Sequence, residues 1–253
     1  MIIIGLGTGR SGTTSLAHLL NKQPNSVVFH EMNPSMMRFS GTKAPVLNTI
    51  KEYEAILDGG DPSYLTVDLG RKQSADKYDA LSQMKEVSLL GDIAFYYLTY
   101  VEDIIAISNR VRFVCLKRDR SQTINSWIKK SRIERWRSKW WGERLSALMQ
   151  RIPFHESKNF WMDHDGTEWR LDPVWDKCFP TFKASSKDEA IGKYYDYYYE
   201  EAEKLTLKHP EVFKIIELDR LNTEEGKTEI MNFCGISAEG RDMGDVWIHR
   251  IKE

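Results

Sequence analysis

An apolar run, a glycine-rich turn and a helix-compatible stretch follow one another at the beginning of the chain. Residues 2–4 are three isoleucines, residues 7–14 read Gly-Thr-Gly-Arg-Ser-Gly-Thr-Thr, and the helix-compatible stretch begins at Ser15. A buried strand that enters a helix through such a turn brings several backbone N–H groups and the positive end of the helix dipole to one point. This order of elements therefore predicts an anion cradle at the first turn.

The spacing within the turn points away from ordinary ATP or GTP chemistry. Gly7 and Gly12 have the spacing of a phosphate-binding loop, but Thr13 stands where nucleotide hydrolases have Lys. The cation lies earlier, at Arg10. A glycine turn that only joins a strand to a helix is the plainer alternative. Two adjacent hydroxyls and a guanidinium group favour phosphate or sulfate binding over that alternative.

Composition limits the class of protein. The chain has 253 residues, which suits one domain, and its net charge of −1 argues against general affinity for nucleic acid. Three scattered cysteines form no metal-binding spacing and predict reduced thiols in a cytoplasmic protein. Met1 lies directly before the first apolar run, and no apolar run is long enough for a membrane span. We therefore expect neither a signal peptide nor a transmembrane segment.

Short apolar runs alternate with helical patterns along the chain, as is typical of a central, mainly parallel sheet of about five strands with helices on both faces. Strands are predicted at residues 2–5, 26–30, 87–90, 112–116 and 213–217, with a weaker one at 64–67. Helices are predicted at residues 14–21, 93–108, 121–130, 187–207 and 228–234. Because ligands bind beyond the carboxyl ends of parallel strands, the polar residues that follow the strands should converge on one crevice.

The region from Trp127 to Trp175 interrupts this alternation and contains seven of the eight tryptophans. An amphipathic helix with solvated cations explains its first part, and contact with a membrane surface is another interpretation. We predict a mostly helical insertion at about residues 128–185 that acts as an acceptor lid, since aromatic faces and guanidinium groups suit sugars or anionic ligands. The run Asp163-His164-Asp165 is interpreted as a polar turn rather than a metal site.

A second motif lies in the middle of the chain. The apolar residues 111–116 predict a buried strand that delivers Arg118 to its carboxyl end, and Ser126 follows eight residues later. A guanidinium fork and a neutral hydroxyl donor together can bind a second phosphate. The alternative is a surface Arg118 paired with Asp119 and a Ser126 that faces solvent.

Together the two motifs carry a resemblance to a known family. Residues 7–14 resemble the 5′-phosphosulfate loop of the sulfotransferase family, and Arg118 with Ser126 resembles its 3′-phosphate motif, spacing included. The stretch from Tyr194 to Ile236 resembles the family's last helix and strand. The resemblance implies a single P-loop-like, three-layer α/β domain over residues 1–253. It also implies 3′-phosphoadenosine 5′-phosphosulfate (PAPS) as donor, 3′-phosphoadenosine 5′-phosphate (PAP) as product, and no metal.

The resemblance further implies roles for individual residues. Those expected to hold the 5′ end of the donor are Gly9, Arg10, Ser11, Gly12, Thr13 and Thr14, and those expected to hold its 3′-phosphate are Arg118 and Ser126. Arg10 is also expected to stabilise charge on the transferred group and on the leaving oxygen.

A base must accept the proton of the acceptor, and three residues are candidates. We predict Glu31, because family members place a carboxylate after the second strand, with His30 as the second choice and Asp92 as the third. Strand alternation predicts that only one of His30 and Glu31 faces the acceptor. A structural salt bridge is the plainer interpretation of Glu31.

The expected function is sulfuryl transfer to a hydroxyl or amine of a small-molecule or carbohydrate acceptor. One alternative is a P-loop kinase, which needs a loop Lys and an acidic magnesium ligand such as Asp92. The other is a nucleotide-binding module without turnover. The sequence leaves the identity of the acceptor and the oligomeric state open.

Overall fold

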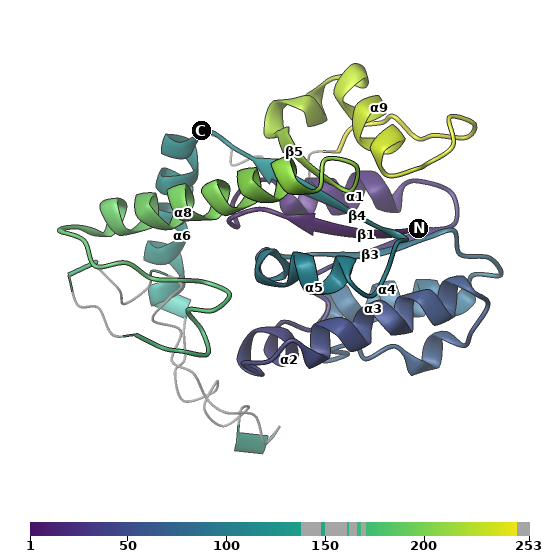
Figure 1. The fold of residues 1–253 in the computed structure, drawn as a ribbon, viewed down its shortest axis with the longest axis horizontal. Coiled ribbons are helices and arrows are strands. Elements are labelled where there is room, and N and C mark those ends of the chain that lie inside the picture. Colours follow the sequence, from purple (N-terminus) through teal and green to yellow (C-terminus); the bar gives the residue numbers. More distant parts are fainter. Residues whose placement is uncertain (138–147, 150–160, 162–165, 168–170, 247–253) are drawn as a thin grey trace.

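Five parallel strands in the order β2-β3-β1-β4-β5 form the centre of the molecule (Figure 1). The strands are β1 (Ile2–Leu6), β2 (Ser26–His30), β3 (Leu89–Ile93), β4 (Val111–Lys117) and β5 (Phe213–Glu217). The computed structural model describes residues 1–137, 148–149, 161, 166–167 and 171–246. All five predicted strands are present, and the predicted α/β fold class is confirmed.

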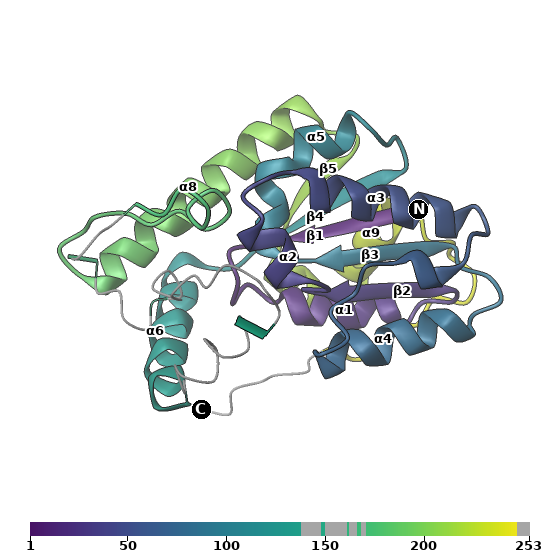
Figure 2. The same ribbon diagram turned by 90° about the horizontal axis from the view of Figure 1, so that it is seen from below.

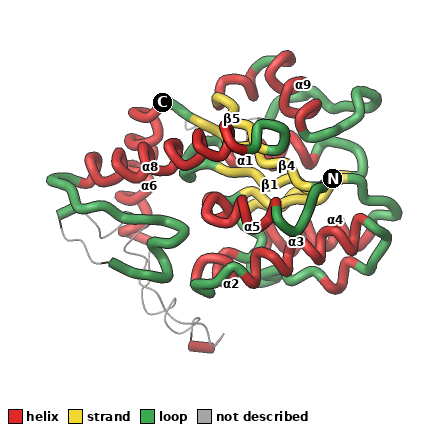
Figure 3. The backbone as a smooth tube through the Cα atoms, viewed as in Figure 1, coloured by secondary structure: helices red, strands yellow, loops and turns green. Residues whose placement is uncertain are grey.

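Helices surround the sheet, as the red segments around the yellow strands in Figure 3 show. The α-helices are α1 (Thr13–Asn21), α2 (Pro34–Phe39), α3 (Ala44–Leu57), α4 (Lys72–Gln83), α5 (Val101–Ile105), α6 (Arg120–Arg137), α8 (Lys187–Lys208) and α9 (Glu224–Phe233). Short 3₁₀ helices are η1 (Pro62–Tyr64), η2 (Phe95–Tyr100) and η4 (Leu218–Asn222). Ser186 caps the start of α8, because its hydroxyl accepts the backbone N–H of Glu189.

The two faces of the sheet bury separate apolar clusters, because successive side chains of a strand point to opposite sides. Ile2 and Ile4 of β1 pack in the larger cluster, together with residues of α3, α5 and α8. Ile3 packs in the smaller one, with residues of α1 and α9. A strand buried on both faces needs a continuous apolar sequence, which is the reason for the isoleucine run.

The central position of β1 brings its following loop to the carboxyl edge of the sheet between β3 and β4. Leu6 of β1 pairs with Cys115 of β4, and His30 of β2 pairs with Ile93 of β3, so the strands end nearly level. Figure 2 shows α6 and the first part of α8 extending beyond this edge. The fold therefore gathers the loops that follow the strands into one region, as predicted from parallel topology.

Several predicted boundaries differ from the structure. The third strand begins at Leu89 and continues to Ile93, so the helix predicted at residues 93–108 is replaced by η2 and the short α5. The weak strand predicted at 64–67 is wrong, because Tyr64 ends a 3₁₀ turn and the residues after it are irregular. Helices α2, α3 and α4, which fill the connection between β2 and β3, were not predicted.

The tryptophan-rich region lies partly outside the described residues, and the Asp163-His164-Asp165 run lies wholly outside them. Trp127, Trp161 and Trp175 are buried. Residues 171–185 form turns and irregular segments rather than the predicted helix.

In the part of the chain that the structure describes, no helix combines the length and apolar character needed to cross a membrane. Those same residues bring no group of three or more His, Cys, Asp or Glu side chains together in a way that could hold a metal.

Candidate functional site

The loop between β1 and α1 folds through backbone conformations that favour glycine. Gly9 and Gly12 have φ angles of 74° and 89°. A Cβ atom at Gly9 would lie 2.7 Å from the Trp127 ring, so a larger residue there meets a steric barrier as well as a strained backbone. Arg10 adopts a positive φ of 59° without being glycine. Such strain is found most often at functional sites.

This loop and the second motif line the same cavity, which has a volume of about 480 Å³ and is called the loop cavity below. From the loop and the start of α1 the lining residues are Gly7, Gly9, Arg10, Gly12, Thr13, Thr14 and Ser15. From the second motif they are Arg118 and Ser126. Thus seven of the eight residues predicted to hold the donor surround one space; the exception is Ser11.

Hydrogen bonds connect the two motifs directly. The Arg10 Nε group donates to Ser126 Oγ at 3.0 Å, and Arg118 donates to the Arg10 carbonyl at 3.1 Å. Arg118 also donates to Gln122 Oε1 at 3.2 Å. The neighbouring Asp119 accepts hydrogen bonds from Ser121 and Gln122 at the start of α6.

Ser11 lies beneath the loop rather than at its surface. It is fully buried and is not among the residues that line the loop cavity. Its hydroxyl packs against Gly7, which has no room for a side chain there, and finds no hydrogen-bond partner. Among the predicted donor-binding residues, Ser11 is therefore the one that the fold separates from the cavity.

His30 and Glu31 both line the loop cavity, and which of them faces the acceptor stays a prediction. Glu31 follows the end of β2 with a φ of 54°, so it no longer obeys the alternation of side chains along the strand. His30 Nε2 lies 3.1 Å from Thr13 Oγ1, whereas Glu31 Oε2 accepts from Arg71 at 3.3 Å. The two candidate bases therefore have different partners on one wall.

Asp92 is not positioned to act as a base or as a magnesium ligand in the loop cavity. It lies within β3 rather than at its end, is fully buried, and does not line the cavity. Its carboxylate accepts the hydroxyls of Tyr96 and Tyr97 and the backbone N–H of Met32. Burial raises the pKa of Asp92 to about 6, although the hydrogen bonds from Tyr97 and Met32 oppose that shift.

Part of the lining was missed by sequence reasoning. The additional residues include Gln122, Trp127 and Lys130 of α6 and Leu218, Asp219 and Asn222 of η4. Gln122, Ser126 and Lys130 are spaced by four residues and so share one face of α6, which is a signal that the sequence contains. The η4 residues reach the cavity because β5 ends at the same edge of the sheet as β1 and β4.

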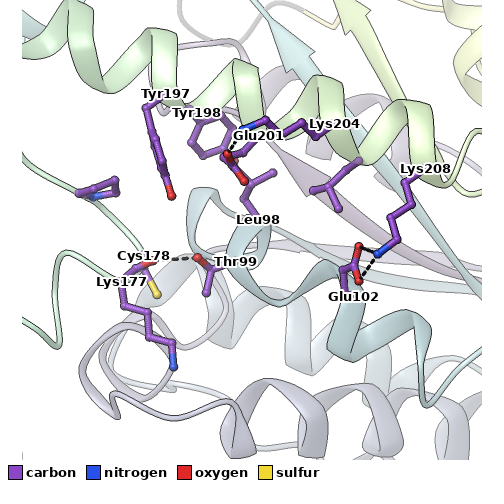
Figure 4. Close-up of a pocket in the computed structure, with 12 residues that line it drawn as sticks. Leu98, Thr99, Glu102, Lys177, Cys178, Tyr197, Tyr198, Glu201, Lys204 and Lys208 are labelled. Atoms are coloured by element: carbon purple, nitrogen blue, oxygen red, sulfur yellow. Dashed lines mark hydrogen bonds and ion pairs between the residues drawn. The ribbon is translucent and has the colours of Figure 1, made fainter.

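A second cavity, of about 320 Å³, lies between α8, the η2–α5 segment and the chain around Cys178 (Figure 4). None of the predicted site residues lines it. Lys204 bonds to Glu201 and Lys208 to Glu102, each at 2.7 Å. Lys177, which also lines this cavity, donates instead to the Gly41 carbonyl at 3.3 Å.

Comparison with known proteins identifies the family. The model of the sulfotransferase domain matches residues 2–235. A crystal structure of a sulfotransferase from Alicyclobacillus acidocaldarius is similar at 12% identity and a TM-score of 0.46, over 95% of this chain and 83% of that one. The sulfotransferase domain from the curacin biosynthetic pathway is similar at 12% identity and a TM-score of 0.49, over 99% and 78%. A search of curated proteins gives no match. On the strength of the domain match over nearly its whole length, this chain belongs to the sulfotransferase domain family.

Proposed function

We propose that the chain transfers a sulfuryl group from PAPS to a hydroxyl group of a small-molecule or carbohydrate acceptor and releases PAP. The observation that carries the proposal is the 3.0 Å hydrogen bond between Arg10 of the first loop and Ser126 of the second motif, at the wall of the loop cavity. A nucleoside with anionic groups at two ends suits a cavity in which two anion-binding motifs meet.

The residues assigned to the donor fall into two groups. Thr13 begins α1, so the free N–H groups of its first turn and the helix dipole favour the 5′-phosphosulfate. Arg118 and Ser126 are assigned to the 3′-phosphate. Arg118 supports this role because its guanidinium group donates hydrogen bonds to neutral oxygens of Gln122 and Arg10.

Sulfuryl transfer needs an acceptor oxygen in line with the bond that breaks, a base for its proton, and positive charge near the leaving oxygen. Arg10 is assigned to supply the positive charge near the leaving oxygen, because it lies within the first loop, in a left-handed backbone conformation, and lines the cavity. Glu31 is assigned as the base, and its bond to Arg71 orients the carboxylate at the cavity wall. His30 is the alternative base, since it lines the same wall.

Isothermal titration calorimetry with PAP and with ATP tests the choice of donor. We expect PAP to bind more tightly than ATP, and Arg118→Ala to weaken PAP binding roughly 10- to 100-fold, the usual effect of losing charge-assisted hydrogen bonds. ATP affinity should change little. Arg110→Ala is the matched control, because Arg110 pairs with Asp58 and precedes β4 at its opposite end.

Comparable affinities for PAP and ATP, both insensitive to Arg118→Ala, would refute the choice of PAPS. An ATPase activity that requires magnesium and disappears with EDTA would support the kinase alternative instead. Tight PAP binding without turnover on a broad set of hydroxyl acceptors would favour the non-catalytic alternative.

A further inference from the structure

Four tyrosines on one face of α8 direct their hydroxyls at backbone groups of the two donor motifs. They are Tyr194, Tyr195, Tyr198 and Tyr199, all buried. Positions i, i+1, i+4 and i+5 of a helix share a face, so such a stripe resembles ordinary core packing. The hydroxyl groups distinguish this stripe of tyrosines from ordinary core packing, because each hydroxyl is hydrogen-bonded to a main-chain atom.

Two of these tyrosines contact the first loop. The Tyr198 hydroxyl accepts the backbone N–H of Gly7 at 3.0 Å and donates to the Phe95 carbonyl at 3.1 Å. The Tyr194 hydroxyl donates to the Thr8 carbonyl at 3.4 Å. Gly7 is the first residue after β1, so these contacts fix the point at which the loop leaves the sheet.

The other two tyrosines contact the second motif. The Tyr195 hydroxyl donates to the Arg118 carbonyl at 2.6 Å, and the Tyr199 hydroxyl donates to the Leu116 carbonyl at 2.7 Å. These carbonyls lie at the end of β4 and just beyond it. One helix therefore holds the backbone of both motifs, and the 22-residue α8 is long enough to be a stiff spacer between them.

We propose that Tyr198 and Tyr195 are positioning residues that set the first loop and Arg118, respectively, at the separation required by a nucleotide with phosphates at both ends. This inference rests on the proposed function. The direct contacts between the motifs use Arg10, Ser126 and Arg118, which are the groups assigned to the donor. A bound donor competes for those groups, whereas the phenol contacts use main-chain atoms of Gly7 and Arg118 and persist beside it.

The two tyrosines have different predicted effects on affinity. Tyr198→Phe removes the acceptor of the Gly7 N–H and disturbs the 5′ end, so it should weaken AMP and PAP by a similar factor, roughly tenfold. Tyr195→Phe releases the Arg118 carbonyl and should weaken PAP roughly tenfold while leaving AMP unchanged. The dissociation constant of AMP divided by that of PAP therefore falls in Tyr195→Phe and stays constant in Tyr198→Phe.

Tyr197→Phe is the matched control on the same helix. Tyr197 is 40% exposed, packs against Phe182 and lines the second cavity, where Figure 4 shows it pointing toward Cys178. Its loss should change neither affinity. Thermal unfolding of each variant as a single transition shows that the fold is retained.

Backbone hydrogen exchange gives a second readout that needs no nucleotide. The Gly7 amide should exchange faster in Tyr198→Phe than in the wild type and in Tyr197→Phe, because it loses its acceptor. Unchanged exchange, or equal loss of AMP and PAP affinity in both Tyr195→Phe and Tyr198→Phe, would overturn the inference. If the wild type fails to prefer PAP over AMP while the exchange pattern holds, the proposed function fails and the positioning role of Tyr198 stands.

Discussion

The loop cavity and the second cavity differ less in size than in how their charges are partnered. Their volumes are about 480 and 320 Å³, and each has cationic side chains in its lining. In the second cavity Lys204 and Lys208 bond to carboxylates and Lys177 bonds to a main-chain carbonyl, whereas in the loop cavity Arg118 bonds to an amide oxygen and a main-chain carbonyl. A cation that already faces a carboxylate has little attraction left for an anionic ligand. The partners of the cations are therefore the feature that favours the loop cavity over the second cavity as the proposed donor site.

The largest effect is expected at the proposed base. Glu31→Gln should lower kcat by on the order of 10²–10⁴, because general base catalysis contributes that much and an amide cannot accept the proton. Glu201→Gln in the second cavity is the matched control and should leave kcat unchanged. Steady-state kinetics with PAPS and a hydroxyl acceptor measures both. Full activity in Glu31→Gln, with none in His30→Ala, would transfer the role to His30.

A smaller loss is expected for the loop arginine. Arg10→Ala should lower kcat by on the order of 10²–10³, the effect of removing one group that stabilises developing charge in the transition state. Lys204→Ala, which removes a cation from the second cavity, should have no effect on turnover. Single-turnover rates at saturating PAPS separate this loss from weaker binding. An Arg10→Ala variant that loses only affinity would show that Arg10 binds the ground state and the transition state equally.

The smallest effect concerns two acids, Asp92 within β3 and Glu102 in the lining of the second cavity, whose pKa values shift in opposite directions. Burial raises the pKa of Asp92 from 3.8 to about 6, whereas hydrogen bonds from Lys208 and His209 lower the pKa of Glu102. Folded protein therefore holds the Asp92 proton at a pH where the unfolded chain has lost it. Consequently the Asp92 contribution to the free energy of unfolding falls as pH rises from about 4 to about 6.

Urea unfolding of the wild type and Asp92→Asn across this range measures that contribution as the difference between the two curves. Glu102→Gln is the control in which the contribution to the free energy of unfolding changes with pH in the opposite direction. The pKa of Glu102 is lowered in the folded protein, so its carboxylate stabilises the fold above the ordinary pKa of 4.5, and this stabilisation is lost as pH falls. Parallel curves for the wild type and Asp92→Asn would contradict the raised pKa of the buried carboxyl.

The sequence supported the prediction of the sheet and both donor motifs because their signals are local. Apolar runs mark the strands, Gly7 and Arg118 lie directly after β1 and β4, and Arg10 lies in the loop that Gly7 begins. The end of β3 was placed too early because Asp92 was interpreted as a polar residue beyond the strand. It is tolerated inside the sheet because Tyr96, Tyr97 and Met32 satisfy its oxygens, and only the structure reveals those partners.

Other features were missed for two physical reasons. Helix α4 buries only Ser74 and Leu81, so it has little of the apolar periodicity that predicts a helix. The tyrosine contacts of α8 join residues that are far apart in sequence, 191 positions for Gly7 and Tyr198 and 77 for Arg118 and Tyr195. No pattern within a short stretch of sequence indicates contacts between residues so far apart. In contrast, α3 buries Val46, Ile50 and Tyr53 at helical spacing, so its pattern was present and was overlooked.

Positions 10 and 31 combine a left-handed backbone with a side chain that is assigned to the reaction. Glycine adopts this conformation freely, while arginine and glutamate adopt it at an energetic cost. Replacing either residue by glycine would thus relieve backbone strain and remove a side chain that is proposed to take part in the reaction. Selection for thermal stability alone would therefore favour glycine at both positions, at the expense of the two side chains proposed for the reaction.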